Sequence, residues 1–240
     1  MTTNEFNNEF DILYNNIASN AAPGIDKYEK SVYLTKAQLE IVKEYNGLQN
    51  KYQKGFEGSD KRRTDLKELV KNYKTSTFFK NSENINTNSK FCTLPSDVFL
   101  IKYEKGIFKK NNCDSELTII PVSLDEFEEN FKNPFRKPYS EKAWRLDYNT
   151  STVELVSDVD ITEYQLRYLK YPEPIILTNL STDPEFTGMN LTIDGIVSEQ
   201  TCKLNKEIHS EILDRAVELA VRDYKESNLQ NRIQLNNRNN

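Results

Sequence analysis

The sequence has few of the residues that catalytic, metal-binding and nucleotide-binding sites use. Its 240 residues contain a single histidine and only seven glycines. One histidine is too few for a histidine-rich zinc site or for an iron site with two histidines and one carboxylate. Neither GxGxxG nor GxxxxGK[ST] occurs, and so few glycines disfavour a phosphate cradle of successive backbone amides. We therefore expect no enzyme, no cofactor and no metal site.

The isolated candidates for chemistry each have a simpler interpretation. His209 lies early in a polar helical segment, so we expect its side chain to be solvated. Asp158 and Asp160 could place two carboxylates on one side of a strand, but a solvated strand edge requires no metal. The Lys-Arg-Arg run at 61–63 has aspartates beside it, which indicates a charge cluster at a helix start. We expect Trp144 to lie in a core, because no basic groove is evident in which it could stack on bases.

Cysteine is scarce, and long apolar runs and an excess of positive charge are absent from the sequence. The three cysteines, Cys92, Cys113 and Cys202, are widely spaced and odd in number, which favours free thiols over a disulfide framework. The first ten residues contain two acidic residues, no basic residue and no apolar core, so we expect no secretory signal and no membrane association. A net charge of -5 and a pI of about 5.2 disfavour a nucleic-acid-binding protein.

Aromatic residues are what the sequence has in quantity. Hydrophobic residues make up 37% of the chain, and 13 Tyr and 12 Phe are among them. The chain is long enough for one large domain or two small ones. We expect an α+β fold with a small, aromatic-rich core.

Helical periodicity near the N-terminus predicts three helices that form part of a helical body over residues 1–80. After Thr2 and Glu5, which have capping-box spacing, the first helix carries an apolar stripe of Phe6, Phe10, Leu13 and Ile17. A second helix is expected over 31–46, before Gly47. The third carries a stripe of Leu66, Leu69, Val70 and Tyr73. A polar linker is expected over 75–90.

From residue 91 the apolar period changes towards two, which predicts a β-rich insertion over 91–177. We expect a small mixed or antiparallel sheet, with an early turn at Lys105-Gly106. Ser123 and Glu126 have the spacing of a capping box and predict a short helix. A hairpin is expected around 148–151, and a further strand over 163–171.

The C-terminal part predicts a helix that packs on the helical body over residues 200–227. Its narrow apolar stripe consists of Ile208, Ile212, Ala216, Leu219 and Ala220. Residues 228–240 are predicted to be an extended tail, too poor in apolar residues to become ordered alone. We expect this tail to be an assembly element, with apolar residues inserted into a partner and basic residues paired with its acidic groups: Leu229, Ile233 and Leu235, and Arg232 and Arg238.

Several segments of the chain resemble ring or neck proteins of crAss-like phages, among the head-to-tail adaptor proteins of short-tailed bacteriophages. The resemblance is carried by Glu9–Ile17, Ala22–Ser31, Leu34–Gln38, Asn133-Pro-Phe-Arg136, Ala143-Trp-Arg145, Arg167–Pro172 and Glu211–Tyr224. It implies a helical body with an inserted β-domain, and a structural virion protein assembled in the bacterial host cytoplasm. It also implies a homo-oligomeric ring, twelvefold, which joins the portal protein to other neck and tail rings and passes DNA without binding it specifically.

Two other functions remain as alternatives. A soluble assembly or interaction module of phage morphogenesis would be absent from finished particles. A nucleic-acid-binding regulator is disfavoured by the acidic pI and would show salt-dependent binding to DNA.

Overall fold

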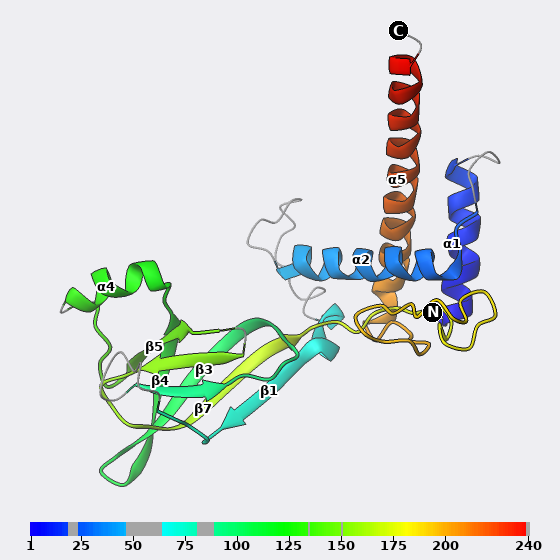
Figure 1. Cartoon of the computed structure of the whole chain (residues 1–240). Coiled ribbons are helices and arrows are strands. Elements are labelled where there is room, and N and C mark those ends of the chain that lie inside the picture. The colour runs from blue at the N-terminus through cyan, green and yellow to red at the C-terminus, as the bar shows by residue number, and fades with distance from the viewer. Residues whose placement is uncertain (19–23, 47–63, 81–88, 134, 150, 239–240) are drawn as a thin grey trace. The chain divides into compact units, whose positions relative to one another are not determined.

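The computed structural model of the chain describes residues 1–18, 24–46, 64–80, 89–133, 135–149 and 151–238. The chain forms two compact units, drawn in Figure 1. One unit comprises Met1–Glu68 and Pro172–Asn240, and we call it the helical unit. The other comprises Leu69–Tyr171, and we call it the sheet unit.

Three long helices lie in the described part of the helical unit. They are α1 (Thr3–Ala18), α2 (Lys27–Asn46) and α5 (His209–Arg238), which follows the short 3-10 turn η2 (Lys206–Ile208). Both α1 and α2 pack on α5, and α2 crosses it (Figure 1). The stripe predicted for the C-terminal helix is confirmed, because all five of its residues are buried.

Two capping boxes start the N-terminal helices. In the first, which the spacing predicted, Glu5 N donates to Thr2 Oγ1 at 3.2 Å and Thr2 N donates to Glu5 Oε2 at 2.7 Å. In the second, Glu29 N donates to Asp26 Oδ1 at 2.7 Å. Helix α2 therefore begins at Lys27, four residues before the predicted start at 31, and the Asp26-x-x-Glu29 spacing is the sequence signal for this earlier start.

The buried face of α1 differs from the predicted stripe. Phe6, Phe10 and Tyr14 are buried, at spacings of four residues. Ile17, which the stripe included, is 57% exposed. The helix therefore buries three aromatic residues and exposes the aliphatic Ile17.

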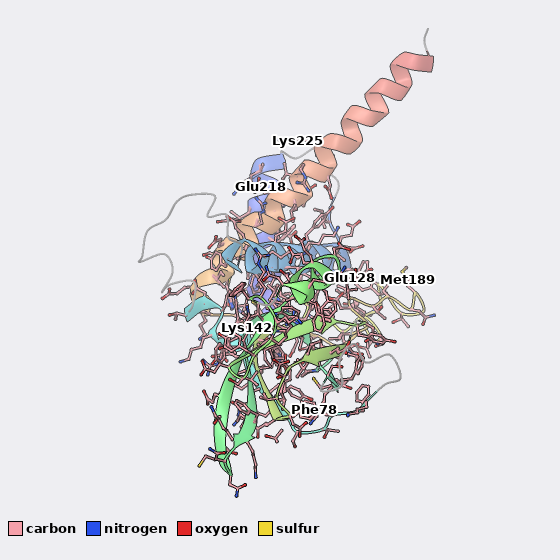
Figure 2. The ribbon with its side chains drawn as sticks, turned by 90° about the vertical axis from the view of Figure 1, so that its left-hand side faces the viewer. Phe78, Glu128, Lys142, Met189, Glu218 and Lys225 are labelled. Atoms are coloured by element: carbon pink, nitrogen blue, oxygen red, sulfur yellow. The ribbon has the colours of Figure 1, made fainter. Side chains whose placement is uncertain are left out.

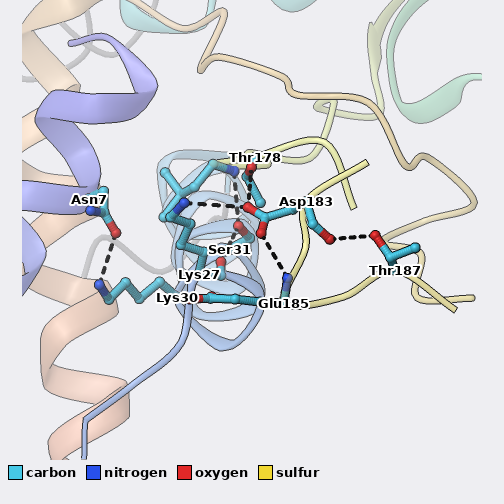
Figure 3. A network of polar contacts seen from close by, with 9 residues as sticks. Asn7, Lys27, Lys30, Ser31, Thr178, Asp183, Glu185 and Thr187 are labelled. Carbon is cyan, nitrogen blue, oxygen red and sulfur yellow. Dashed lines mark hydrogen bonds and ion pairs between the residues drawn. The ribbon is translucent and has the colours of Figure 1, made fainter. Parts of the chain in front are cut away.

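The segment between the sheet unit and α5 is a loop with its own small core. Ile176, Leu180, Phe186 and Ile193 are buried together against residues of α2. Figure 3 shows how Asp183 organises this loop: its carboxylate accepts hydrogen bonds from Thr178 Oγ1 at 2.8 Å and from Glu185 N at 3.1 Å. The first of these bonds is the main cause that lowers the pKa of Asp183.

A curled mixed sheet forms the sheet unit. Its strands, in the order β1-β7-β3-β4-β5-β6-β2 across the sheet, are β1 (Val70–Thr75), β7 (Ile161–Lys170), β3 (Val98–Lys110), β4 (Cys113–Pro121), β5 (Lys142–Asp147), β6 (Thr152–Val156) and β2 (Lys90–Thr93). Neighbouring strands are antiparallel except β4 and β5, which are parallel and are connected through α4 (Leu124–Lys132). The predicted mixed sheet, hairpin and last strand are confirmed.

The prediction of a body with three N-terminal helices is wrong. The predicted third helix is replaced from Lys67 onwards by the 3-10 turn η1 (Lys67–Leu69) and by β1. Strand β1 pairs with β7 from Val70↔Leu169 to Thr75↔Tyr164, and these backbone hydrogen bonds outweigh the weak helical periodicity of a short segment. Across the described residues, helix and strand contribute about equally, and strands dominate the middle of the chain.

The prediction of a turn at Lys105-Gly106 is also wrong. Strand β3 runs through both residues, and the chain reverses at Asn111 and Asn112, whose φ angles of 52° and 62° fit a two-residue hairpin turn. Gly106 serves close packing instead, because a Cβ atom there would lie 3.0 Å from Leu117 Cδ1.

Candidate assembly surfaces

A groove of about 510 Å³ runs between α1 and α5 in the helical unit. Its floor is apolar, because Leu13 and Ile17 of α1 face Val217 and Val221 of α5. Charged residues of α5 form its rim: Asp214, Glu218, Arg222 and Lys225. Figure 2 labels Glu218 and Lys225 on this part of α5.

Charge is distributed unevenly along this groove. Asp214 and Lys225 form no ion pair with any residue that the structure describes, whereas Glu218 is bound by Arg215 Nη1 at 3.0 Å. Asp214 and Lys225 are eleven positions apart, which is about 16 Å along a helix. The groove therefore carries a free carboxylate near one end and a free ammonium group near the other.

The five candidate residues of the tail, Leu229, Arg232, Ile233, Leu235 and Arg238, lie in the backbone of α5. The predicted extended conformation is wrong for this segment, because α5 is helical as far as Arg238. The side chains from residue 226 onwards lie outside the described part of the structure. Beyond Lys225 the ribbon of α5 continues past α1, away from the other described elements of the helical unit (Figures 1 and 2).

His209 is buried, so the prediction of a solvated side chain is wrong. It is 3% exposed, its Nε2 lies 3.1 Å from the Leu204 carbonyl oxygen, and its Nδ1 lies 2.7 Å from the Met1 amino group. These partners fit a neutral ring that donates from Nε2 and accepts at Nδ1. Burial, followed by the nearby amino-terminal charge, lowers the pKa of His209. The histidine is thus a structural residue at the start of α5.

The sheet unit presents an isolated aromatic side chain. Phe135, in the segment that joins α4 to β5, is 95% exposed. No residue pattern in the sequence singled it out, although its motif, Asn133-Pro-Phe-Arg136, is among the segments that carry the family resemblance. A phenylalanine between two prolines is the signal that could have identified it.

A buried polar cluster lies inside the sheet unit. Arg145 Nη1 donates to Glu104 Oε2 at 2.6 Å, and the Tyr164 hydroxyl donates to the other oxygen of the same carboxylate. Burial raises the pKa of Tyr164, and the adjacent carboxylate acts in the same direction. Burial alone would lower the pKa of Arg145, but the attraction of Glu104 holds it above its ordinary value. The cluster pairs its own charges and offers none of them to a ligand.

The structure describes two of the remaining candidates, the aspartate pair and Trp144. Asp160 pairs with Lys90 at 2.6 Å, and the described residues contain no group of three or more potential metal ligands. Trp144 is buried against Phe127 and Phe131, as predicted. The Lys-Arg-Arg run at 61–63 lies outside the described residues.

All three cysteines are free, as predicted. Burial raises the pKa of Cys92 to about 12 and that of Cys202 to about 11. None of the helices in the described ranges combines the length and the apolar character that crossing a membrane requires.

Exposed apolar surfaces of this kind are typical of a protein that assembles with other chains. Comparison with known proteins identifies the family. Residues 1–232 match the phage tail ring protein 3/4 family, and the chain belongs to this family of structural ring proteins. It is 42% identical to ring protein 4/5 of Bacteroides phage crAss001, over 99% of both chains. It is 34% identical to ring protein 3 of the same phage, over 92% of this chain and 95% of the relative. The resemblance to ring proteins of crAss-like phages is confirmed.

Proposed function

We propose that the chain forms a closed ring of twelve copies in the neck of a phage particle, joins the portal protein to the tail, and surrounds the path of the DNA. The observation that carries the proposal is the match to a ring protein family over residues 1–232, nearly the full length of the chain. The apolar groove of the helical unit supports it, because such a surface needs a partner.

The proposed channel surface is neutral or acidic. DNA must slide past the ring, and each phosphate contact by a lysine or arginine would add affinity and slow the movement. With a net charge of -5 per chain, twelve copies would carry roughly -60. Tight binding of DNA by the isolated protein at physiological salt would contradict this part of the proposal.

The end of α5 is the proposed contact with a neighbouring subunit or with the portal. Its apolar positions, Leu229, Ile233 and Leu235, would insert into the partner, and Arg232 and Arg238 would pair with acidic groups there. The course of α5 past the rest of the described helical unit supports this role, because its last turns have no described neighbour there.

Quantitative mass spectrometry of purified particles tests the proposal directly. We expect the chain in the particles, with the copy number of one complete ring, and electron microscopy of the neck should show its density. Absence from purified particles would instead support a soluble assembly module that acts only during morphogenesis.

A further inference from the structure

We infer that Phe135 of one subunit inserts into the groove between α1 and α5 of the next subunit in the ring. This inference rests on the proposed ring and adds to it the contact that joins neighbouring copies. It concerns two copies of the chain, each contributing one of its units.

Phe135 is turned outwards by the way α4 ends. Phe127, Phe131 and Phe135 follow one another at four-residue spacing and would share one face of a continuous helix. The first two pack on Trp144, with ring centroids 5.7 Å and 6.3 Å from the indole. The helix ends at Lys132, and Asn133 has an extended backbone with φ of -88° and ψ of 114°. The third ring therefore leaves the face that covers Trp144.

The segment that carries Phe135 is held in place by hydrogen bonds. Phe135 N donates to Asn133 Oδ1 at 3.0 Å, and Arg136 Nη1 donates to Asn130 Oδ1 at 3.0 Å. Such local bonds limit the entropy that the segment would lose on docking. An almost fully exposed aromatic side chain on a backbone held by hydrogen bonds has the properties of an interface anchor.

The groove between α1 and α5 matches this anchor in size and polarity. Its volume of about 510 Å³ can accept an aromatic side chain together with part of the flanking chain. Its floor includes Ile17, which would be removed from water on docking. Both the anchor and the receiving surface are exposed apolar groups, so docking would bury each against the other.

The charges flanking Phe135 also match those of the groove. Residues 125–129 include four carboxylates, whereas Lys132, Arg136 and Lys137 follow them, so the segment is acidic at one end and basic at the other. The groove has the free carboxylate of Asp214 near one end and the free ammonium group of Lys225 near the other. A docked segment can therefore place its basic end near Asp214 and its acidic end near Lys225.

The anchor and the groove are different surfaces of the same chain, so a second copy can supply the occupant of the groove. A contact between unlike patches is heterologous, and it generates a ring when the rotation between subunits closes. Each subunit would then offer one anchor and one groove, and a complete ring would leave neither exposed.

Photo-cross-linking of the full-length chain tests the inference. The photoreactive residue p-benzoylphenylalanine replaces Phe135, which keeps an aromatic ring at the anchor position. After irradiation of assembled rings we expect a ladder of covalent oligomers, with cross-linked peptides that contain Ile17, Val217 or Val221. The matched control carries the same photoreactive residue at Tyr103, which is 53% exposed on β3, and should give no cross-link to these peptides.

A pair of variants tests the groove from the other side. Ile17→Asp should reduce ring formation at least tenfold, whereas Ile12→Asp should not. Ile12 is a fair control, because it lies on the same helix, is 60% exposed and is not part of the groove. Far-ultraviolet circular dichroism will establish that both variants fold.

The outcomes separate this inference from the proposed function. Rings that form without cross-links into the groove, or that tolerate Ile17→Asp as well as Ile12→Asp, would overturn the contact and leave the ring intact as a proposal. Cross-links from position 135 to the end of α5 or to another neck protein would also overturn it. Absence of the chain from particles would overturn the ring itself.

Discussion

The two units of this chain differ in how they are built from the chain and in what they bury. The sheet unit is one continuous segment, Leu69–Tyr171, and encloses even a charged cluster within its core. The helical unit is assembled from both ends of the chain and leaves an apolar groove between α1 and α5. The groove of the helical unit has an apolar floor, whereas a hollow of about 620 Å³ on the sheet unit is lined mostly by polar residues, such as Ser115, Glu116 and Thr118. An exposed apolar groove is typical of a surface that binds another chain.

Both edges of the sheet are protected from pairing with other chains. The outer strand β1 bears Lys71 and Lys74, both exposed, and charged residues protect an edge strand from pairing with other chains. At the opposite edge, Phe79 and Phe91 exchange backbone hydrogen bonds of 3.0 Å and 2.9 Å, which cover part of β2. With these strand edges protected, the nearly fully exposed Phe135 is the contact that we propose for the sheet unit.

The largest expected effect is the loss of a buried aromatic residue from the helical unit. Phe10→Ala should lower the free energy of unfolding by about 4 kcal/mol, because it leaves a cavity under α1. Circular dichroism should show the loss in the helical signal, while fluorescence of Trp144, the single tryptophan, should report an unchanged sheet unit. Ile12→Ala on the same helix is the control and should have almost no effect. A shift of the Trp144 transition equal to the helical one would mean that the units unfold together.

The matching change in the sheet unit is Arg145→Ala. It leaves Glu104 buried without its cation, and should cost about 3 kcal/mol in the free energy of unfolding. Fluorescence of Trp144 during urea titration measures this loss. Lys132→Ala, which removes an exposed pair with Glu128 at 3.7 Å, is the control and should leave the midpoint unchanged. Equal midpoints for the two variants would show that the buried pair contributes no more than a surface pair.

A smaller effect is expected from pH, and it should distinguish the two units. The pKa of His209 is lowered in the folded state, so below the ordinary histidine pKa of 6.5 the unfolded chain binds a proton that the folded chain does not. Stability should therefore fall as pH decreases below 6.5, until the folded pKa is reached. The loss should appear in the helical unit alone, since the sheet unit has no histidine.

Thermal unfolding at pH 7 and at pH 5.5, followed by circular dichroism and by Trp144 fluorescence, measures this difference. His209→Gln should remove the extra loss between these two values. If the variant keeps the same pH dependence as the parent chain, other groups are responsible.

The sequence predicted the features that depend on neighbouring residues. Capping boxes at Thr2 and Ser123 have fixed spacings, and both start helices in the structure. The third helix was mispredicted because Val70 and Tyr73 fit a helical stripe, whereas their partners in β7 lie almost a hundred residues away. Burial of His209 likewise depends on the distant Met1, so no local pattern could indicate it.

The candidate assembly surfaces also depend on contacts that local sequence patterns do not indicate. The groove requires α1 to turn Phe6, Phe10 and Tyr14 inwards, and a stripe read from spacing alone placed Ile17 in the core instead. Exposure of Phe135 depends on where α4 ends and on which rings Trp144 can accept. Both surfaces result from competition between apolar residues for a limited core, and that competition is decided by tertiary packing.

The smallest expected effect on stability belongs to the end of α5. Deletion of residues 228–240 should leave thermal unfolding of the isolated chain almost unchanged, because the buried residues of α5 end at Val221 within its described part. The same deletion should block incorporation into particles, if Leu229, Ile233 and Leu235 insert into a partner. Immunoblotting of particles formed in cells that supply the truncated chain measures incorporation. A matched variant, with Arg232 and Arg238 both changed to Glu, keeps the length of the helix and tests the predicted pairing with acidic groups. Stability and assembly would thus reside in successive parts of one helix, and normal incorporation of the truncated chain would contradict that division.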